Sequence, residues 1–234
     1  PIQEKQMTTV LDDNVHNIAV EGTFDDAQKI VKEVFNDLDF RDEFHLGAVN
    51  SINWARVMAQ IVYYFYSAFR YMERSRASDV VFSVPTGNFG DIYAGYLAKK
   101  MGLPVSKLIL ATNENDILYR VIKTGSYKIS QVTSTLSPSM DIQIASNFER
   151  FVFDISGKNG SLINEKMDNL SKGNEFVLSS SELSEAQSCF MAIRIDTRQT
   201  LEVMKRYRKE GFTIDPHTAV GVAAAEQSRC QNVI

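Results

Sequence analysis

The sequence predicts an α/β protein built on a mostly parallel sheet, and three consecutive runs of residues lead to this prediction. Residues 79–84 are short, apolar and β-branched, as in a buried strand. Residues 91–101 follow with helical spacing, and residues 107–112 form a second strand-like run. Because short connections join strand, helix and strand, the two strands are expected to run parallel in one sheet.

The region before this unit is expected to contain two more strands and a helix. Residues 15–21 alternate loosely between apolar and polar side chains, which predicts a strand. Thr23 then resembles a helix N-cap, with Asp26 at the spacing of a capping box, and apolar residues follow at helical spacing. Residues 46–49 are a short apolar run that predicts another strand.

A long aromatic helix is expected from Trp54 to about Met72. Its apolar side chains form a wide stripe, which predicts that the helix is buried between two layers. We expect the aromatic residues to belong to the core and not to a cofactor site. The stripe consists of Val57, Met58, Ile61, Val62, Phe65 and Phe69.

The rest of the chain is expected to be mainly helical. Periodicity and capping residues predict further helices near residues 115–122, 148–155, 161–170, 181–188, 197–209 and 219–229. Residues 135–141 form a polar loop interrupted by a proline. Residues 157–195 have the weakest pattern and are expected to be a surface excursion. Residues 231–234 resemble the start of a strand.

Composition excludes several classes of function. The chain has 234 residues, of which 44% are hydrophobic and 23% charged, as in ordinary globular proteins. A net charge of −4 with dispersed Lys and Arg side chains argues against a nucleic acid or an anionic membrane as partner. No apolar run approaches the roughly 20 residues of a membrane span. Two cysteines without metal-ligand spacing and three scattered histidines predict a cytoplasmic protein without a metal site.

The strongest candidate for a ligand site is the run Val-Pro-Thr-Gly-Asn-Phe-Gly-Asp at residues 84–91, between the predicted strand and helix. Main-chain N–H groups at a glycine-rich turn before a helix favour an anion. The spacing fits neither the dinucleotide-binding glycine pattern nor the P-loop, so a single phosphate on a cofactor fits better. The alternative is an ordinary tight turn. The cradle would consist of Gly87, Asn88, Phe89, Gly90 and Asp91.

A second group of polar residues lies at another predicted strand-to-helix junction. Asn50, Ser51 and Asn53 precede the aromatic helix, and Arg56 lies in its first turn. Arg56 would be placed to bind a phosphate that helix N–H groups also hold. Alternatively, Asn53 is an N-cap and Ser51 a turn residue, which would make the group purely structural.

Two other polar segments are weaker candidates. His217 follows Asp215 and Pro216 at a predicted helix start, where it would be placed as a general base. A histidine at such a position more often caps a helix or orients a loop, and we expect that role. Residues 113–116 follow the end of a strand, where ligands of α/β proteins gather. They either line a cleft or cap the next helix.

Residues 84–91 and 94–104 resemble the cofactor-phosphate loop and the following helix of the threonine synthase family. Further segments resemble the family in the same order, from residue 1 to about residue 230, whereas residues 157–195 match weakly. These further segments are Gln3–Thr9, Val49–Arg56, Ala111–Asp116, Thr135–Asp141, Ser146–Arg150 and Asp215–Gly221.

The resemblance implies a fold type II enzyme dependent on pyridoxal 5′-phosphate, with an architecture like that of the tryptophan synthase β subunit. The family are carbon–oxygen lyases acting on phosphates: they convert O-phosphohomoserine and water to threonine and phosphate, the last step of threonine biosynthesis. On this resemblance, Gly87 to Asp91 would hold the cofactor phosphate. Asn50, Ser51 and Arg56 would bind the substrate phosphate.

The resemblance also implies that this chain is an internal fragment lacking both ends. The family's Schiff-base lysine lies in a Phe-Lys-Asp motif before the matched region, and no Phe-Lys-Asp occurs here, so no catalytic residue is assigned. Residues 1–45 would be the trailing part of a small mobile domain, and residues 46–234 part of the large cofactor domain. The chain alone is therefore expected to be inactive, and its truncated sheet predicts poor solubility.

Two other functions stay open from the sequence. One is another fold type II lyase or synthase, although the group of Asn50, Ser51 and Arg56 favours a phosphorylated substrate. The other is a non-catalytic, threonine-synthase-like protein that keeps a phosphate pocket for binding or signalling. The sequence predicts no oligomeric state.

Overall fold

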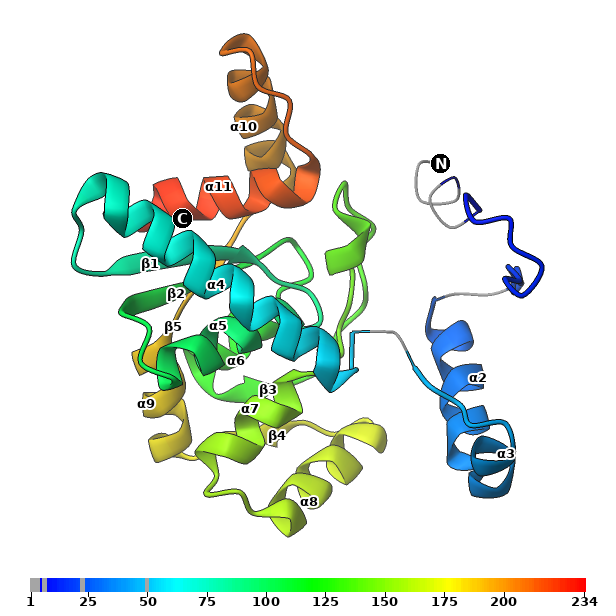
Figure 1. Cartoon of the computed structure of the whole chain (residues 1–234). Coiled ribbons are helices and arrows are strands. Elements are labelled where there is room, and N and C mark those ends of the chain that lie inside the picture. The colour runs from blue at the N-terminus through cyan, green and yellow to red at the C-terminus, as the bar shows by residue number, and fades with distance from the viewer. Residues whose placement is uncertain (1–4, 6–7, 22–23, 49–50) are drawn as a thin grey trace. The chain divides into compact units, whose positions relative to one another are not determined.

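The computed structural model describes residues 5, 8–21, 24–48 and 51–234 (Figure 1). The chain divides into two compact units, Pro1–Ala48 and Val49–Ile234. The boundary predicted from the sequence, between residues 45 and 46, is near this division. The assignment of the two parts to a small mobile domain and a large cofactor domain stays a prediction.

The described residues of the first unit include the helices α2 (Phe24–Asn36) and α3 (Leu38–Glu43). The Asp37 side chain caps α3 by accepting a hydrogen bond of 3.0 Å from the Phe40 main-chain N–H. The predicted capping residue Thr23 lies outside the described residues.

Both strands predicted for this unit lack support in its described residues. The strand predicted at residues 15–21 is wrong, because these residues form no regular structure and their apolar side chains are exposed. Residues 46–48 also form no strand, and residue 49 lies outside the described part of the chain. Loose alternation does not make a strand where no neighbouring strand is present to accept its hydrogen bonds.

A parallel sheet of three strands forms the centre of the second unit, residues 51–234, as the sequence predicts. The strands β1 (Val80–Pro85), β2 (Val105–Thr112) and β5 (Phe190–Arg194) lie in the order β1-β2-β5. Val233 forms a parallel bridge to Val81 of β1. The predicted strand start at residues 231–234 therefore lies beside the sheet.

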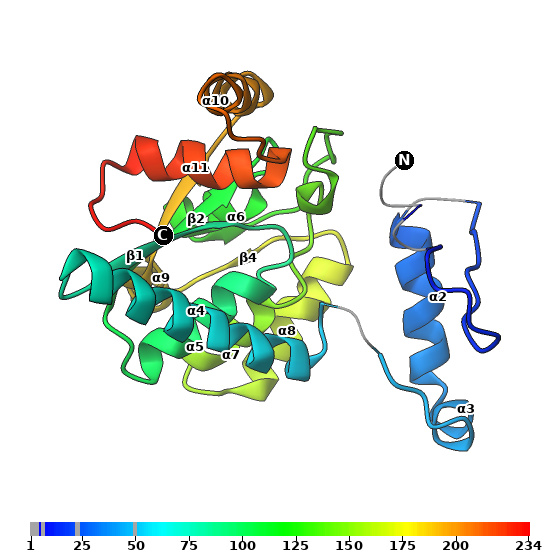
Figure 2. The same ribbon diagram turned by 45° about the horizontal axis from the view of Figure 1, so that its top comes forward.

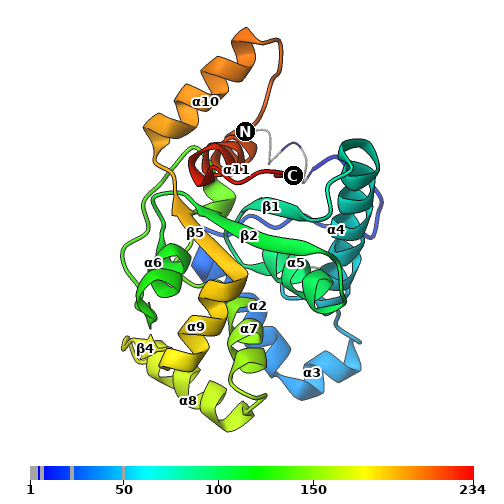
Figure 3. The same cartoon turned by 90° about the vertical axis from the view of Figure 1, so that its left-hand side faces the viewer.

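The sheet is covered on both faces, because successive side chains of a strand point to opposite sides. In β2, Leu108 and Leu110 join the core cluster on the side of α5 (Gly90–Lys100) and α7 (Phe148–Ile155), whereas Ile109 and Ala111 join the cluster on the side of α11 (Pro216–Ser228). Figures 2 and 3 show α11 over one face of the sheet and α5 below the other. A continuous apolar run of this kind is typical of a strand buried on both faces.

Every helix predicted for the second unit is present, with ends within three residues of the prediction. The helices are α4 (Trp54–Ser75), α5 (Gly90–Lys100), α6 (Ile117–Thr124), α7 (Phe148–Ile155), α8 (Gly160–Ser171), α9 (Ser180–Cys189), α10 (Thr197–Lys209) and α11 (Pro216–Ser228). The loop predicted at residues 135–141 contains a short 3₁₀ helix, η1 (Pro138–Met140). The short antiparallel strands β3 (Ser126–Tyr127) and β4 (Phe176–Val177) were not predicted.

Two expectations about the second unit are corrected by the structure. Residues 157–195 are not only a surface excursion, because β5 at their end pairs with β2 in the central sheet. The helix predicted to lie between two layers, α4, is buried on one face only. Its inward side chains include Val57, Tyr64 and Ala68, whereas Met58, Val62 and Phe69 of the predicted stripe are exposed.

Within residues 5, 8–21, 24–48 and 51–234, no helix is long and apolar enough to cross a membrane. The same residues contain no group of three or more His, Cys, Asp or Glu side chains placed to hold a metal ion. Cys189 is buried and Cys230 half-buried, and both are free thiols.

Candidate anion-binding site

The glycine loop between β1 and α5 is held by a buried aromatic anchor. Phe89 has left-handed backbone geometry with φ +66°, which is uncommon for a side chain larger than that of glycine. Its ring is 1% exposed and packs edge-on against Phe148 and Phe190, with ring centroids 5.1 and 5.4 Å apart. Packing of this ring stabilises the strained backbone and fixes the point at which α5 begins.

The two glycines of the loop lie where any side chain would collide with its surroundings. A Cβ atom on Gly87 would lie 2.6 Å from the Ser139 carbonyl oxygen, so the loop touches the η1 turn backbone to backbone. A Cβ atom on Gly90 would lie 3.1 Å from Asn88 Oδ1 and 3.2 Å from Asn147 Nδ2. Gly87 is therefore required for close approach of two main-chain segments, whereas Gly90 fits tightly against two side-chain amides.

The buried side chain of Asn147 joins the two groups that the sequence proposes as anion sites. Its Nδ2 donates to the main-chain oxygen of Ser51 at 2.9 Å and to that of Asn88 at 3.3 Å. Its own main-chain N–H donates to the Asn88 oxygen at 3.0 Å. Arg150, one turn further along α7, donates from Nη2 to the Ile52 oxygen at 2.7 Å. The start of α4 and the glycine loop are thus fixed relative to each other.

A cavity of about 220 Å³ lies at this junction, within the second unit. Its lining comes from four places in the sequence: the start of α4, the glycine loop, the η1 turn and the start of α11. The lining residues are Ser51, Arg56, Gln60, Pro85, Gly87, Asn88, Gly90, Asp91, Ser139, Met140 and His217.

Most of the predicted site residues meet in this cavity. Ser51 and Arg56 line it together with four of the five residues of the predicted cradle, and the exception is Phe89, which points into the core. Asn50 lies outside the described residues. Asn53 caps α4 by accepting a hydrogen bond of 2.8 Å from the Ala55 N–H, which is the structural role given above as the alternative.

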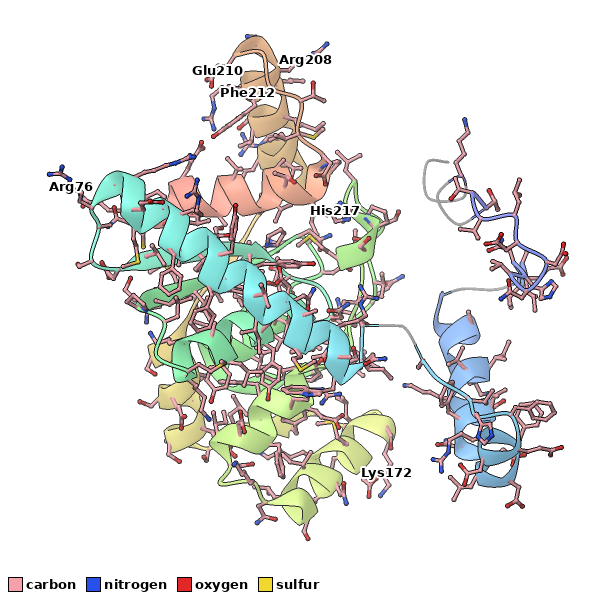
Figure 4. All side chains as sticks on the ribbon, viewed as in Figure 1. Arg76, Lys172, Arg208, Glu210, Phe212 and His217 are labelled. Carbon is pink, nitrogen blue, oxygen red and sulfur yellow. The ribbon has the colours of Figure 1, made fainter. Side chains whose placement is uncertain are left out.

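His217 was expected to cap a helix or orient a loop, and its contacts fit that role. Asp215 is the N-cap of α11 and lies 3.0 Å from His217 Nδ1, while the Ser139 main-chain N–H donates to His217 Nε2 at 3.3 Å. Because Nε2 accepts from Ser139, Nδ1 is the ring nitrogen that donates to Asp215. Figure 4 shows His217 at the start of α11 beside the η1 turn. His217 thus connects α11 to the cavity wall.

The η1 turn is held from its other side by a cluster of hydrogen bonds on Asp141. This carboxylate accepts from Asn113 Nδ2 at 2.8 Å, Asn115 Nδ2 at 2.9 Å and Thr135 Oγ1 at 2.6 Å. The two asparagines follow the end of β2 and are buried. They do not line the cavity and act through the loop that they hold, whereas Glu114 accepts from the Thr197 N–H and Asp116 pairs with Arg120.

Asp91 is the acidic group of the cavity, at the first turn of α5. Its side chain keeps contact with solvent, yet surrounding protein atoms desolvate the carboxyl and raise its pKa. Beneath it, the Tyr64 hydroxyl donates to the Asp91 main-chain oxygen at 2.9 Å, which ties α4 to α5. Arg56 is the permanent cation of the lining.

Ser139, Met140 and Gln60 were missed by sequence reasoning. Gln60 lies one turn after Arg56 on α4, so helical spacing from Arg56 would have found it. Ser139 and Met140 reach the cavity only through contacts between residues more than 50 positions apart. No local sequence pattern shows that these two residues reach the cavity.

The architecture is that of the fold type II enzymes that use pyridoxal 5′-phosphate. No protein-family model matches the chain. A pyridoxal-phosphate-bound threonine synthase from Brucella melitensis superposes with a TM-score of 0.87 at 45% identity, covering 99% of this chain and 50% of that chain. The yeast threonine synthase gives a TM-score of 0.89 at 45% identity, covering 100% of this chain and 49% of that chain.

The chain is a homologue of threonine synthase. It is 50% identical over 229 residues to the threonine synthase of Pseudomonas aeruginosa. The matched region covers 97% of this chain and 48% of that protein. The chain therefore spans about half the length of the relatives that it matches.

Proposed function

We propose that this chain is the phosphate-binding part of a threonine synthase, which converts O-phosphohomoserine and water to threonine and phosphate with pyridoxal 5′-phosphate. The observation that carries the proposal is the single cavity in which Arg56 meets the glycine loop. Homology over 97% of the chain to a threonine synthase supports the same assignment.

The glycine loop is proposed to hold the phosphate of the cofactor. Gly87, Asn88, Gly90 and Asp91 line the cavity at the N-terminus of α5, where main-chain N–H groups and the helix dipole favour an anion. The site fits a compact phosphate monoester, since Gly87 brings bare backbone to the cavity wall. Bound there, the cofactor would supply an electron sink for a carbanion on the substrate.

Ser51 and Arg56 are proposed to bind the phosphate of the substrate, together with Asn50. Arg56 lies in the first turn of α4 and presents a guanidinium to the same cavity. A guanidinium forms paired, charge-assisted hydrogen bonds with phosphate oxygens, which fix orientation as well as affinity. The role of these residues is thus to bind and orient a phosphorylated substrate.

Phosphate recognition can be tested on the chain without any covalent chemistry. Pyridoxamine 5′-phosphate carries no aldehyde, so it does not react with lysines, and pyridoxamine lacks the phosphate. We expect titration calorimetry to show binding of pyridoxamine 5′-phosphate and no binding of pyridoxamine.

Two glycine variants make the test specific. Gly87→Ala should weaken binding by at least about tenfold, because the new Cβ has no room beside Ser139. Gly160→Ala is the control, since its Cβ would meet nothing within 4 Å. Equal binding of the two ligands, or equal affinity in the two variants, would contradict the proposal.

A further inference from the structure

A column of aromatic rings connects the segment of residues 157–195 to the glycine loop. The ring of Phe176 in β4 stacks on that of Tyr127 in β3, with centroids 4.8 Å apart and planes inclined by 5°. Tyr127 stacks in turn on Phe148 at 5.3 Å and 12°. Phe148 packs edge-on against Phe89 of the glycine loop at 5.1 Å. We call these four rings the aromatic column, and Figure 1 shows β3 and β4 beside α7, whose first residue is Phe148.

The aromatic column lies in the interior of the second unit. Its four residues all belong to Val49–Ile234, and each is at most 4% exposed. Centroid distances of this size are those at which ring pairs attract each other beyond the effect of their buried area. Because a protein interior is packed almost without free space, a displacement of one ring shifts the next. The column therefore links the position of Phe89 to that of Phe176.

The hydroxyl of Tyr127 makes a second contact with the start of α7. The buried main-chain N–H of Ala145 donates to Tyr127 Oη at 2.9 Å, and the Ala145 oxygen accepts from the Phe148 N–H at 3.0 Å. Asn147, which joins the start of α4 to the glycine loop, lies within this turn. Burial raises the pKa of Tyr127 to about 12, so the hydroxyl stays neutral near neutral pH. Tyr127 thus holds the turn that carries Asn147, while its ring supports Phe89 through Phe148.

The end of the aromatic column farthest from the loop is fixed by a buried ion pair. Lys166 of α8 lies with Nζ 5.6 Å from the centroid of the Phe176 ring and donates to the Val177 oxygen at 2.9 Å. The same Nζ is 3.4 Å from Glu182 Oε2, and Glu182 belongs to the capping box of α9. A buried pair of this kind is costly to break, because separation would leave a charge unpaired in the interior. Residues 157–195 thus give the column a fixed end.

We propose that Tyr127 is a positioning residue for the glycine loop, acting through Phe148 and Asn147. Within the described part of the chain, Tyr127 is not one of the residues that line the cavity, so it acts on a ligand only through others. The segment of residues 157–195 would then support the anion site without contacting the anion. The identity of the ligand rests on the proposed function, whereas the geometry of the loop does not.

Ordinary core packing is the competing explanation of the aromatic column. Phe89 also packs against Phe151 and Phe190, with centroids 5.8 and 5.4 Å away. If these two rings alone hold the loop, changes at Tyr127 lower only the overall stability. Tyr127→Phe separates the two explanations, because it keeps the ring and removes only the acceptor of the Ala145 N–H. A buried donor without an acceptor then destabilises the turn that carries Asn147.

Amide hydrogen exchange of the chain without ligand, measured by NMR, reports the loop directly. The Gly90 N–H donates to Asn88 Oδ1 at 2.9 Å and the Asn147 N–H to the Asn88 oxygen at 3.0 Å, so both amides exchange faster when the loop opens. Leu110, in the central strand β2, reports overall unfolding. We expect Tyr127→Phe to speed exchange at Gly90 and Asn147 at least about fivefold relative to Leu110.

Val203→Ala is the control for a general loss of stability. Val203 is buried on α10 in the other core cluster, so its truncation destabilises the unit without touching the aromatic column. It should not speed exchange at Gly90 or Asn147 more than at Leu110. If Tyr127→Phe gave the same result as this control, the proposal would be overturned.

A double-mutant cycle tests the role of residues 157–195. Phe176→Leu alone should also speed exchange at Gly90 and Asn147. In a chain that already carries Tyr127→Leu, adding Phe176→Leu should have little further effect on these two amides, because the column is already interrupted. Fully additive effects would show that the two rings act separately, and the column would then not transmit support to the loop.

Ligand affinity provides the functional readout. We expect Tyr127→Phe to bind pyridoxamine 5′-phosphate at least about fivefold more weakly where the chain is folded. Tyr71→Phe is the matched control, since it removes a hydroxyl contact of 3.4 Å with Asn232 near the end of α4 and should leave the affinity unchanged. Equal affinities of the two variants would overturn the proposal. Faster loop exchange in Tyr127→Phe, with no binding even by the unaltered chain, would support the positioning role and contradict the proposed ligand instead.

Discussion

At the scale of single residues, Asp91 contributes a carboxyl group to the cavity that Arg56 also lines. Desolvation by the surrounding protein raises its pKa, so the folded chain holds this proton more tightly than the unfolded chain does. Stability therefore falls as the pH rises through the pKa of folded Asp91, since the unfolded state releases the proton first. The ionised carboxylate also repels a phosphate in the same cavity.

Asp91→Asn should remove this pH dependence. We expect the affinity of the chain for pyridoxamine 5′-phosphate to fall with rising pH more steeply than that of the variant. The ionisation of the ligand is common to both proteins, so the difference between the two profiles isolates Asp91. The same comparison by urea unfolding should show higher stability of Asp91→Asn above the raised pKa. Superimposable profiles would show that Asp91 does not titrate beside the ligand.

Asn147 is the residue that fixes the start of α4 against the glycine loop. Asn147→Ala removes three side-chain hydrogen bonds: those to the Ser51 and Asn88 oxygens lose their donor and that from Arg150 Nε loses its acceptor, at a cost of about 2 kcal/mol in the free energy of unfolding. Asn174→Ala, at an exposed position, is the control. We also expect weaker binding of pyridoxamine 5′-phosphate in Asn147→Ala under conditions where the chain is folded. Unchanged affinity would mean that the loop keeps its shape without Asn147.

At the scale of elements, the loop of residues 133–141 depends on one carboxylate. Asp141→Ala would remove one acceptor from each of the buried amides of Asn113 and Asn115 and the acceptor of the Thr135 N–H, which costs about 2–3 kcal/mol of stability. The η1 turn would lose its anchor and with it the fixed wall beside Gly87. Urea unfolding of Asp141→Ala and of the exposed control Asp168→Ala measures the difference. Equal stability in the two variants would show that the cluster on Asp141 is not stabilising.

The helices of the second unit were predictable because each carries its own signal. Asp196 accepts from the Gln199 N–H at 2.7 Å and starts α10 at the predicted residue, and apolar spacing located α7 to the residue. The strand β5 was missed because its short run, Phe190 to Arg194, can be recognised as a strand only from its pairing with β2. Local spacing also could not show that Met58, Val62 and Phe69 of α4 are exposed, since an apolar pattern does not identify the element that would cover it.

The candidate site was also predictable only in part. The glycine loop and Arg56 were found because their residue types suit anions at helix starts. Their meeting in one cavity depends on Asn147, whose role is set by contacts to Ser51 and Asn88 across 96 and 59 positions. Ser139 and Met140 are brought in by the same kind of long-range contact. A single sequence carries no direct record of such contacts.

At the scale of the whole molecule, the positions of the lysines determine whether the chain alone can bind pyridoxal 5′-phosphate covalently. No lysine is among the residues that line the cavity. The buried Lys166 donates to the Val177 oxygen at 2.9 Å and pairs with Glu182, which is a structural role. We expect pyridoxal 5′-phosphate and borohydride to label no single lysine stoichiometrically. A unique, fully labelled lysine on peptide mapping would contradict this expectation.

The most direct test of the central claim uses a hybrid in which this chain replaces the matched segment of the Pseudomonas threonine synthase. Its activity is measured as phosphate released from O-phosphohomoserine. If this chain is the phosphate-binding half of a threonine synthase, the hybrid turns over the substrate. Arg56→Ala then lowers kcat/KM by at least about 100-fold, while Arg74→Ala in the last turn of α4 leaves it unchanged. A folded hybrid that releases no phosphate, or one in which the two arginine variants behave alike, would contradict the claim.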